Sequence, residues 1–460
     1  MTYNRDEIEP RTRALTKSLI EQDKYNSRGL CMIPDPNGWT IHVCSAQGAK
    51  TVFNNPDLFI KLDTFSAQEG TLSHTFLGGR SLAMLNGNEW RRQRRVFNPI
   101  FQGAMPVDVF GNLVFDVFAE IDKTEIVEDM ADITERYALD AIGKSILNFD
   151  FEATSNPNSE WRNTYNSFSS GLIHPMFFIL PFLDQEKFMW LFPERAKERK
   201  NLQKFLGMVK DVIAEKKKIV AENAKMDIKG ERDLITMMLD VPEEDLLTDD
   251  ELLANVNIFF FAGHETTANA LAFAIYSLAV DQEIQKKARE EVLEIMGDSS
   301  EDTLPTLEMT KGMTYLNQII KETLRKFVPV LGVAPRVAEK DTQIDGTFIP
   351  KGSIVTVDVL GIHRNDNVWE NPDEFNPERF APGGEAELKP EDGFSWLPFG
   401  RGKRQCIGMN FSLAEQRVLL SMLLKRYSWE LPEGASKDIS YEGLITIRPK
   451  DLRVKFTKRY

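Results

Sequence analysis

One cysteine-containing loop constrains this chain more than any other feature. Residues 399–408 read FGRGKRQCIG, and a helical pattern over residues 410–427 follows directly. The first N–H groups of a helix and nearby Arg and Lys side chains favour a thiolate over a thiol. The loop therefore offers Cys406 as a nucleophile or a metal ligand, and its glycines allow the backbone to approach a large flat group.

Other interpretations of the loop have to be weighed against this one. A lone cysteine is most often a small buried apolar side chain. A dinucleotide-binding loop needs a glycine where Gln405 stands, and a phosphate-binding loop needs one where Leu397 stands. A cysteine nucleophile needs a histidine partner, and the nearest histidine in the sequence is His363, far from the loop.

The loop fits the pattern F-x-x-G-x-R-x-C-x-G at every fixed position, which are Phe399, Gly402, Arg404, Cys406 and Gly408. This pattern resembles the haem-binding loop of the cytochrome P450 family. The resemblance implies haem b, iron protoporphyrin IX, as cofactor and Cys406 as the axial thiolate on its iron. Such a ligand favours cleavage of the O–O bond.

Composition and charge agree with a soluble catalytic chain. The net charge of −14 argues against nucleic-acid binding, and three cysteines in 460 residues indicate a reducing compartment. No linker or repeat divides the chain. We expect one mainly helical haem domain over residues 1–460 with small β-sheets and no fused reductase domain. Its β-rich parts are expected near residues 25–60, 335–360 and 439–457.

A basic segment, residues 88–95, reads NEWRRQRR. On a helix Trp90 and Arg94 share a face, and an indole N–H and a guanidinium both donate to carboxylates. The pair resembles the propionate-contacting helix of the same family, and a solvated basic surface is the alternative. Arg336, which ends an apolar connector beginning at Val328, is likewise expected to reach a propionate.

A long helix is expected to begin at a capping box, Thr248 to Glu251, and to continue to about Val280. At its centre residues 260–267 read FFAGHETT. Gly, Glu and two Thr inside an apolar helix cost stability, which points to a functional site. A zinc-protease motif does not fit, because its second histidine would fall at Ala268.

The same segment resembles the oxygen-binding helix of the cytochrome P450 family. The resemblance implies that Ala262 and Gly263 leave room beside the iron for dioxygen. It also implies that Thr266 holds a proton-delivering water that Glu265 connects to bulk solvent. A buried helix with an internally bonded threonine is the alternative.

Two further motifs resemble the structural signature of the family. Glu322 and Arg325 lie three apart on a helix expected over residues 315–327, and Arg379 belongs to a PERF sequence. The three would lock the core behind the haem. The substrate pocket is expected to be apolar and to be lined by Phe260, Phe261, Val330, Leu331, Val333, Leu444 and Ile445.

Local patterns predict the remaining elements that bear on the argument. We expect a helix over residues 11–24, and a hairpin of residues 29–33 with 39–44 around the turn signal DPNG. Further expectations are a helix over 46–54, an irregular segment over 63–87, a helix over 281–297, and strands within 347–360 and 439–456. The aromatic segment 168–192 is either core or a lid that meets apolar substrates or a membrane surface.

Together the motifs imply a haem-thiolate monooxygenase that hydroxylates a hydrophobic substrate, a fatty acid, a steroid or a xenobiotic, with O2. Electrons are expected from NADPH-cytochrome P450 reductase or a similar donor, docking beside Lys403 and Arg404. Alternatives are a peroxide-using peroxygenase or isomerase, which tends to lose the acid–threonine pair, and a haem sensor without catalysis.

The loop and the E-x-x-R neighbourhood look closest to the microsomal branch of the family. Members of that branch usually begin with a membrane anchor, and the first 30 residues here contain no apolar run of roughly 20 residues. We therefore expect the cytosolic face of the endoplasmic reticulum membrane if an anchor has been removed, with peripheral membrane contact, and the cytoplasm otherwise.

Overall fold

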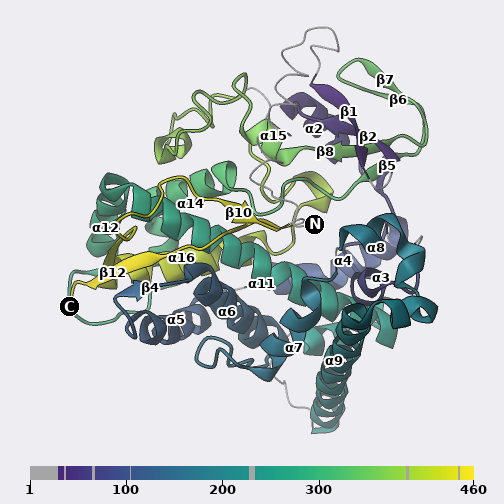
Figure 1. Cartoon of the computed structure of the whole chain (residues 1–460), viewed down its shortest axis with the longest axis horizontal. Helices are drawn as coiled ribbons and strands as arrows, with labels where there is room; N and C mark the ends of the chain where they lie inside the picture. Colours follow the sequence, from purple (N-terminus) through teal and green to yellow (C-terminus); the bar gives the residue numbers. More distant parts are fainter. Residues whose placement is uncertain are drawn as a thin grey trace. The chain divides into compact units, whose positions relative to one another are not determined.

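The computed structural model describes residues 29–35, 38–64, 68–103, 105–172, 174–226, 234–389, 393–443 and 446–460 (Figure 1). The helix expected over residues 11–24 lies outside these ranges. The chain forms two compact units. Unit 1 comprises Met1–Leu62, Met105–Tyr137 and Glu265–Tyr460, and unit 2 comprises Asp63–Ala104 and Ala138–His264. Each unit is described by itself below.

The β-structure of the described residues lies in unit 1 and forms small separate sheets. The largest has the strand order β1-β2-β8-β5-β3. The expected hairpin is confirmed, because β1 and β2 pair antiparallel from Leu30 with Val43 to Asp35 with Gly38. The strands of this sheet are β1 (Leu30–Asp35), β2 (Gly38–Val43), β3 (Phe59–Lys61), β5 (Arg336–Ala338) and β8 (Ile354–Val357).

The other sheets of unit 1 are shorter. A three-stranded sheet has the order β4-β12-β9, with the C-terminal strand β12 at its centre. Strand β6 pairs with β7, and β10 pairs with β11. Their bounds are β4 (Ile126–Val127), β6 (Thr342–Ile344), β7 (Thr347–Ile349), β9 (Tyr427–Glu430), β10 (Tyr441–Glu442), β11 (Arg448–Pro449) and β12 (Val454–Lys458). The strands expected within residues 347–360 and 439–456 are thus present, although Val359 already begins a helix.

Helices make up the rest of unit 1, and their ends follow capping chemistry. The helix expected over residues 281–297 is α12, which Asp281 caps and Gly297 ends with a φ of 80°. The helices are α2 (Ala46–Asn54), α5 (Val107–Ile121), α12 (Gln282–Met296), α13 (Leu307–Gly312), α14 (Thr314–Lys326), α15 (Val359–His363) and α16 (Met409–Arg426), with short 3-10 helices η7 (Pro377–Phe380) and η8 (Gly402–Arg404). Two longer helices, α6 (Met130–Ile142) and α11 (Asp249–Val280), contain the unit boundaries.

All secondary-structure elements among the described residues of unit 2 are helical. Its elements are α3 (Leu72–Leu77), α4 (Gly87–Gln102), the π-helical turn η3 (Gly143–Leu147), α7 (Glu160–Ser169), α8 (Pro175–Ile179), α9 (Pro193–Met226), α10 (Leu234–Leu239) and the 3-10 helices η4 (Pro181–Asp184), η5 (Glu186–Leu191) and η6 (Glu243–Asp245). The rings of Phe76, Tyr165, Phe168, Phe205 and Phe260 form an edge-to-face cluster at its centre.

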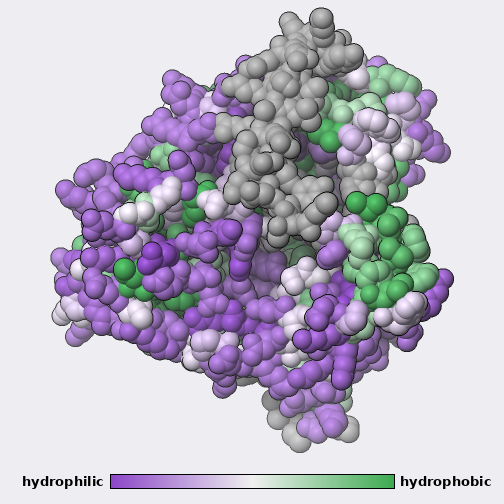
Figure 2. Space-filling model, viewed as in Figure 1, coloured by the Kyte–Doolittle hydropathy of each residue, from purple (hydrophilic) through white to green (hydrophobic). Residues whose placement is uncertain are grey.

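Unit 2 also corrects one expectation and answers another. The segment 63–87 is not wholly irregular, because it contains helix α3. Thr71 caps this helix by accepting from the N–H of His74, and the helix buries Leu72 and Phe76. The aromatic segment 168–192 is partly core, since Phe168 is buried. Other residues of the segment form an apolar surface patch, visible in Figure 2 where Figure 1 places α8, made of Ile179, Leu180, Phe182, Trp190 and Leu191.

Candidate active site

The cysteine loop lies in unit 1, and its cysteine is accessible to solvent. Cys406 is exposed, which excludes the interpretation of a buried apolar cysteine. Its N–H donates to the carbonyl of Phe399 at 2.9 Å, and Gly408 is the N-cap of the 18-residue helix α16. The thiol therefore lies next to the positive end of a long helix dipole, which favours the thiolate form.

Glycines hold this loop against helix α2. Gly400 and Gly402 have φ values of 60° and 73°, which other residues rarely adopt. A Cβ atom on Gly402 would stand 2.8 Å from the carbonyl oxygen of Phe53, the penultimate residue of α2. Position 402 therefore requires a residue without a side chain, because the cysteine loop packs closely against the end of α2. Gly408 differs, because a Cβ there would meet the sulfur of Cys406 at an ordinary 4.0 Å.

Arg336 is a buried cation, and no acidic side chain among the described residues pairs with it. Only 3% of it is exposed, it donates to the carbonyl of Phe59 at 3.0 Å, and its Nε has no hydrogen-bond partner among the described residues. Burial alone lowers the pKa of its guanidinium to about 10. The guanidinium carbon lies 5.5 Å from the centre of the Phe53 ring, and a Cβ on Gly400 of the cysteine loop would lie 3.5 Å from that same ring.

Helix α11 is fastened within unit 1 on both sides of Thr266. The hydroxyl of Thr267 donates to Ser412 Oγ on α16 at 2.9 Å. The hydroxyl of Thr446 donates to Glu265 Oε2 at 3.1 Å. Thr266 and Glu265 are both half-buried, whereas the residues from Thr267 to Ala279 are all buried. The accessible part of the helix therefore includes the two residues expected to handle protons, in a fixed register to the helix that follows Cys406.

The preceding residues of α11 belong to unit 2. Ala262 is exposed, although most residues of α11 are buried. A Cβ on Gly263 would collide with the side chain of Ile142, so the close packing of α6 requires glycine there. The Phe260 ring is 1% exposed and packs in the aromatic cluster of unit 2, while Phe261 is half-buried and contacts Phe76.

Two arginines of the basic helix α4 form ion pairs within unit 2. Arg92 is paired with Glu251 and donates to the carbonyl of Leu246, and Arg95 lies 3.4 Å from Asp245. These pairs join α4 to the start of α11 within unit 2. Trp90 and Arg94, the pair singled out from the sequence, are half-buried on the same helix.

The two structural motifs meet in unit 1. Arg325 donates to both oxygens of Glu322 at 2.7 and 2.8 Å, and the side chains of both residues are completely buried. Arg379 lies 3.4 Å from Glu322 and also pairs with Glu385. A fully buried ion pair needs such additional partners, because desolvation of two charges is costly.

The apolar connector meets the C-terminal β-structure. Val330 forms a bridge with Thr446, the hydroxyl partner of Glu265. Val330, Leu331 and Val333 are half-buried. These residues therefore share unit 1 with Glu265 and Cys406. Leu444 and Ile445, the other expected pocket residues of the tail, lie outside the described residues.

These observations fit the expected haem. A buried guanidinium without a carboxylate is unfavourable unless an anion reaches it, and a propionate is such an anion. An exposed sulfur at a helix N-terminus suits ligation of an iron ion. The Phe53 ring under Arg336 belongs to α2, the helix against which the cysteine loop packs at Gly402. Cys406 would hold the iron and Arg336 a propionate.

Sequence reasoning missed three participants. Thr446, Thr267 and Ser412 each bond to a partner distant in the chain, and short polar residues in apolar surroundings were the available signal.

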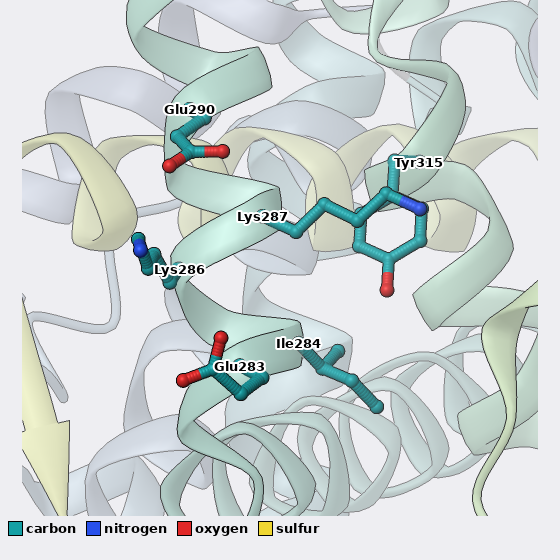
Figure 3. A pocket seen from close by; sticks show the side chains of 6 residues that line it. All are labelled: Glu283, Ile284, Lys286, Lys287, Glu290 and Tyr315. Atoms are coloured by element: carbon teal, nitrogen blue, oxygen red, sulfur yellow. The ribbon is translucent and has the colours of Figure 1, made fainter.

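A surface pocket of about 330 Å³ on α12, lined by Glu283, Ile284, Lys286, Lys287, Glu290 and Tyr315, contains none of the expected site residues (Figure 3).

The fold and the cysteine loop define a mainly helical haem-thiolate enzyme. A cytochrome P450 family model matches residues 40–456, so the chain belongs to the cytochrome P450 family. The chain is 31% identical over 369 residues to cytochrome P450 3A2 of Rattus norvegicus and 30% identical over 370 residues to cytochrome P450 3A5 of Homo sapiens. It is 29% identical over 366 residues to cytochrome P450 3A12 of Canis lupus familiaris. In each case the match covers 76% of this chain and 70% of the relative.

Family membership confirms the fold class, the haem b cofactor and the reaction class expected from the sequence. The protein is a haem-thiolate monooxygenase that uses O2, a hydrophobic substrate and electrons from NADPH-cytochrome P450 reductase. Among the described residues, no helix is both long and apolar enough to cross a bilayer.

Proposed function

We propose that Cys406 would hold the iron of the haem with which this chain oxidises lipophilic molecules, and that residues 1–460 act as a single haem domain. The observation that carries the proposal is the exposed sulfur of Cys406 at the start of α16. Bound haem supplies the oxygen-activating chemistry, and the protein supplies the ligand, the protons and the pocket. Arg336 is proposed to bind one propionate, and Trp90 and Arg94 to contribute further donors.

The proton path is proposed to run along the accessible part of α11. Thr266 orients a water molecule, and Glu265 exchanges protons between that water and solvent. Thr446 supports this role because its hydroxyl donates to Glu265 Oε2 and so fixes the position of that carboxylate. Ala262 is proposed to keep space open on the same helix. Gly263 serves the packing of Ile142 and is proposed to keep the dioxygen space clear by keeping the helix close to α6.

The substrate is proposed to be an apolar molecule of steroid, fatty-acid or xenobiotic type. Val330, Leu331 and Val333 offer half-buried apolar surface in unit 1, and Phe261 does so in unit 2. Leu444 and Ile445 keep their sequence-based assignment, whereas the position of Phe260 in the aromatic cluster favours a role in packing. The apolar patch on α8, η4 and η5 supports a location at a membrane surface, namely the cytosolic face of the endoplasmic reticulum.

The experiment that tests the proposed ligand is the carbon monoxide difference spectrum of the reduced protein. The wild type and Cys31→Ser, which removes a cysteine of strand β1, should show the red-shifted Soret band of thiolate-ligated haem. Cys406→Ser should lose it while retaining helical circular dichroism. Retention of the band in Cys406→Ser would show that another group ligates the iron.

A further inference from the structure

One of the buried titratable groups that the mechanism above leaves unused is His363, at the end of α15. It is completely buried in unit 1, and both of its ring nitrogens lie within hydrogen-bond distance of backbone groups. The N–H of Leu397 donates to its Nε2 at 2.7 Å, and its Nδ1 lies 3.2 Å from the carbonyl oxygen of Arg325. His363 thus bridges helix α14 and the segment that leads into the cysteine loop.

These contacts fix one tautomer of the ring. Because Nε2 accepts from the N–H of Leu397, it carries no proton. The ring proton is therefore on Nδ1, which donates it to the carbonyl oxygen of Arg325. Burial, together with the charge of Arg325, lowers the pKa of His363 to about 3, so the ring is neutral under physiological conditions. A neutral ring suits a fixed bridge, because it accepts on one side and donates on the other.

Both ends of the bridge are anchored. At one end Arg325 is held by Glu322 and returns a hydrogen bond from Nη1 to the carbonyl of His363 at 2.8 Å. At the other end the carbonyl of Leu397 accepts from the N–H of Gly400 at 2.9 Å. Gly400 follows Phe399, whose carbonyl accepts from the N–H of Cys406. A continuous chain of hydrogen bonds and one peptide link therefore runs from the buried ion pair to the cysteine.

We propose that His363 is a positioning residue for the cysteine loop, and that its ring transmits the fixed position of the Glu322–Arg325 pair to the backbone at Leu397. The inference rests on the proposed role of Cys406 as iron ligand. A second link, from Trp396 Nε1 to the carbonyl of Lys321 at 3.1 Å, runs parallel to it but approaches from a half-exposed side chain. His363 is the buried link.

Three substitutions separate positioning from general stability. His363→Gln keeps an amide that can reach Leu397, His363→Asn is too short for Leu397 but keeps a donor near Arg325, and His363→Leu removes both bonds. The matched control is Gln285→Leu. Gln285 is equally buried in unit 1, and its Oε1 accepts from the N–H of Trp429 at 3.2 Å. That variant also leaves a buried backbone N–H without its acceptor, but far along the chain from the cysteine loop.

The measurements are the carbon monoxide difference spectrum, the reduction potential of the haem, and thermal unfolding. We expect His363→Asn and His363→Leu to raise the ratio of non-thiolate to thiolate Soret signal roughly tenfold, as expected for an orphaned buried N–H in the loop. They should also shift the reduction potential. His363→Gln should stay close to the wild type, and Gln285→Leu should unfold at a lower temperature with an unchanged spectrum.

The outcomes distinguish the two proposals. A wild type without the thiolate band would overturn the assignment of Cys406 itself. A wild-type band together with unchanged spectra and potentials in His363→Asn and His363→Leu would overturn the role of His363 alone. If His363→Leu yields no folded protein, the comparison of His363→Asn with His363→Gln decides, and equal behaviour of these two would count against the proposal.

Discussion

At the scale of single residues, the role proposed for Thr266 depends on its hydroxyl alone. Its neighbours are fixed by other contacts, Thr267 to Ser412 and Glu265 to Thr446, so a change at Thr266 leaves the position of α11 intact. Thr266→Ala should lower product formation by about tenfold to a hundredfold and release the electrons as hydrogen peroxide, because protons no longer arrive in order. The measurement is peroxide formed per NADPH consumed.

The control for this prediction is Thr266→Ser, which keeps the hydroxyl. It should couple NADPH oxidation to product nearly as well as the wild type. Full coupling in Thr266→Ala would mean that proton delivery does not pass through this hydroxyl. Loss of the haem spectrum in that variant would instead indicate a structural role.

A second prediction concerns Glu415 on α16. The carboxyl group is completely buried, and neither oxygen has a hydrogen-bond partner among the described residues. Burial raises its pKa well above the ordinary value of 4.5. The folded protein therefore binds a proton that the unfolded chain releases above pH 4.5. The free energy of unfolding should fall as pH rises above 4.5, by up to about 1.4 kcal/mol per pH unit from this group, until the folded carboxyl ionises.

Glu415→Gln should remove this contribution, because the amide does not titrate. Denaturant unfolding of both proteins between pH 5 and 8, at about unit intervals, measures the difference in slope. Glu430→Gln, on an exposed residue of β9, is the matched control and should keep the wild-type slope. Parallel curves for the wild type and Glu415→Gln would show that the buried carboxyl is ionised when folded.

Residue chemistry explains which parts of the site could be read from the sequence. The loop around Cys406 could be predicted, because the groups that stabilise its thiolate are its neighbours in the chain. The bridge through His363 could not, since its partners Arg325 and Leu397 lie 38 and 34 positions away. The reason for glycine at 263 was also hidden, because it depends on Ile142 of another helix.

At the scale of elements, α11 begins where the capping box predicted. Thr248 N–H donates to Glu251 Oε2 at 3.0 Å, and the N–H of Glu251 donates to Thr248 Oγ1 at 3.2 Å. Thr248→Ala should lower the free energy of unfolding by about 1 kcal/mol, since the helix loses one side-chain acceptor at its first turn. Denaturant titration followed by circular dichroism measures this, and Thr248→Ser should retain most of the stability. Equal losses in both variants would contradict a hydroxyl-based cap.

Element boundaries followed local rules where the capping residues lie next to the helix. This explains why α2, α11 and α12 agree with their expected ranges within a few residues. Helix α3 was missed because it is only six residues long and sits among glycines, so its apolar pattern is too short to be seen. Burial of Leu72 and Phe76 in unit 2, which is tertiary information, stabilises it.

At the scale of the whole molecule, the order of motifs predicted the family and the mainly helical fold. The division of contacts into two units was not predicted, because no linker marks it. Two of its boundaries fall inside helices, one between Tyr137 and Ala138 in α6 and one between His264 and Glu265 in α11. A helix is continuous in sequence pattern whatever it packs against, so a boundary of this kind leaves no trace in periodicity or composition.

The last prediction concerns the apolar patch of unit 2. Phe182 and Trp190 are 54% and 77% exposed, and Ile179 beside them is 68% exposed. Each is unfavourable in water by roughly 25 cal/mol per Å² of apolar area, and aromatic rings prefer the membrane interface. The protein should therefore sediment with vesicles of phosphatidylcholine and phosphatidylserine.

Phe182→Glu/Trp190→Glu should weaken this partition about tenfold or more, since two apolar anchors become charged. Trp39→Glu changes an equally prominent tryptophan, 65% exposed on β2 of unit 1, and should bind vesicles like the wild type. Equal binding by all three proteins would place the membrane contact elsewhere, and absence of wild-type binding would remove the patch as a membrane contact.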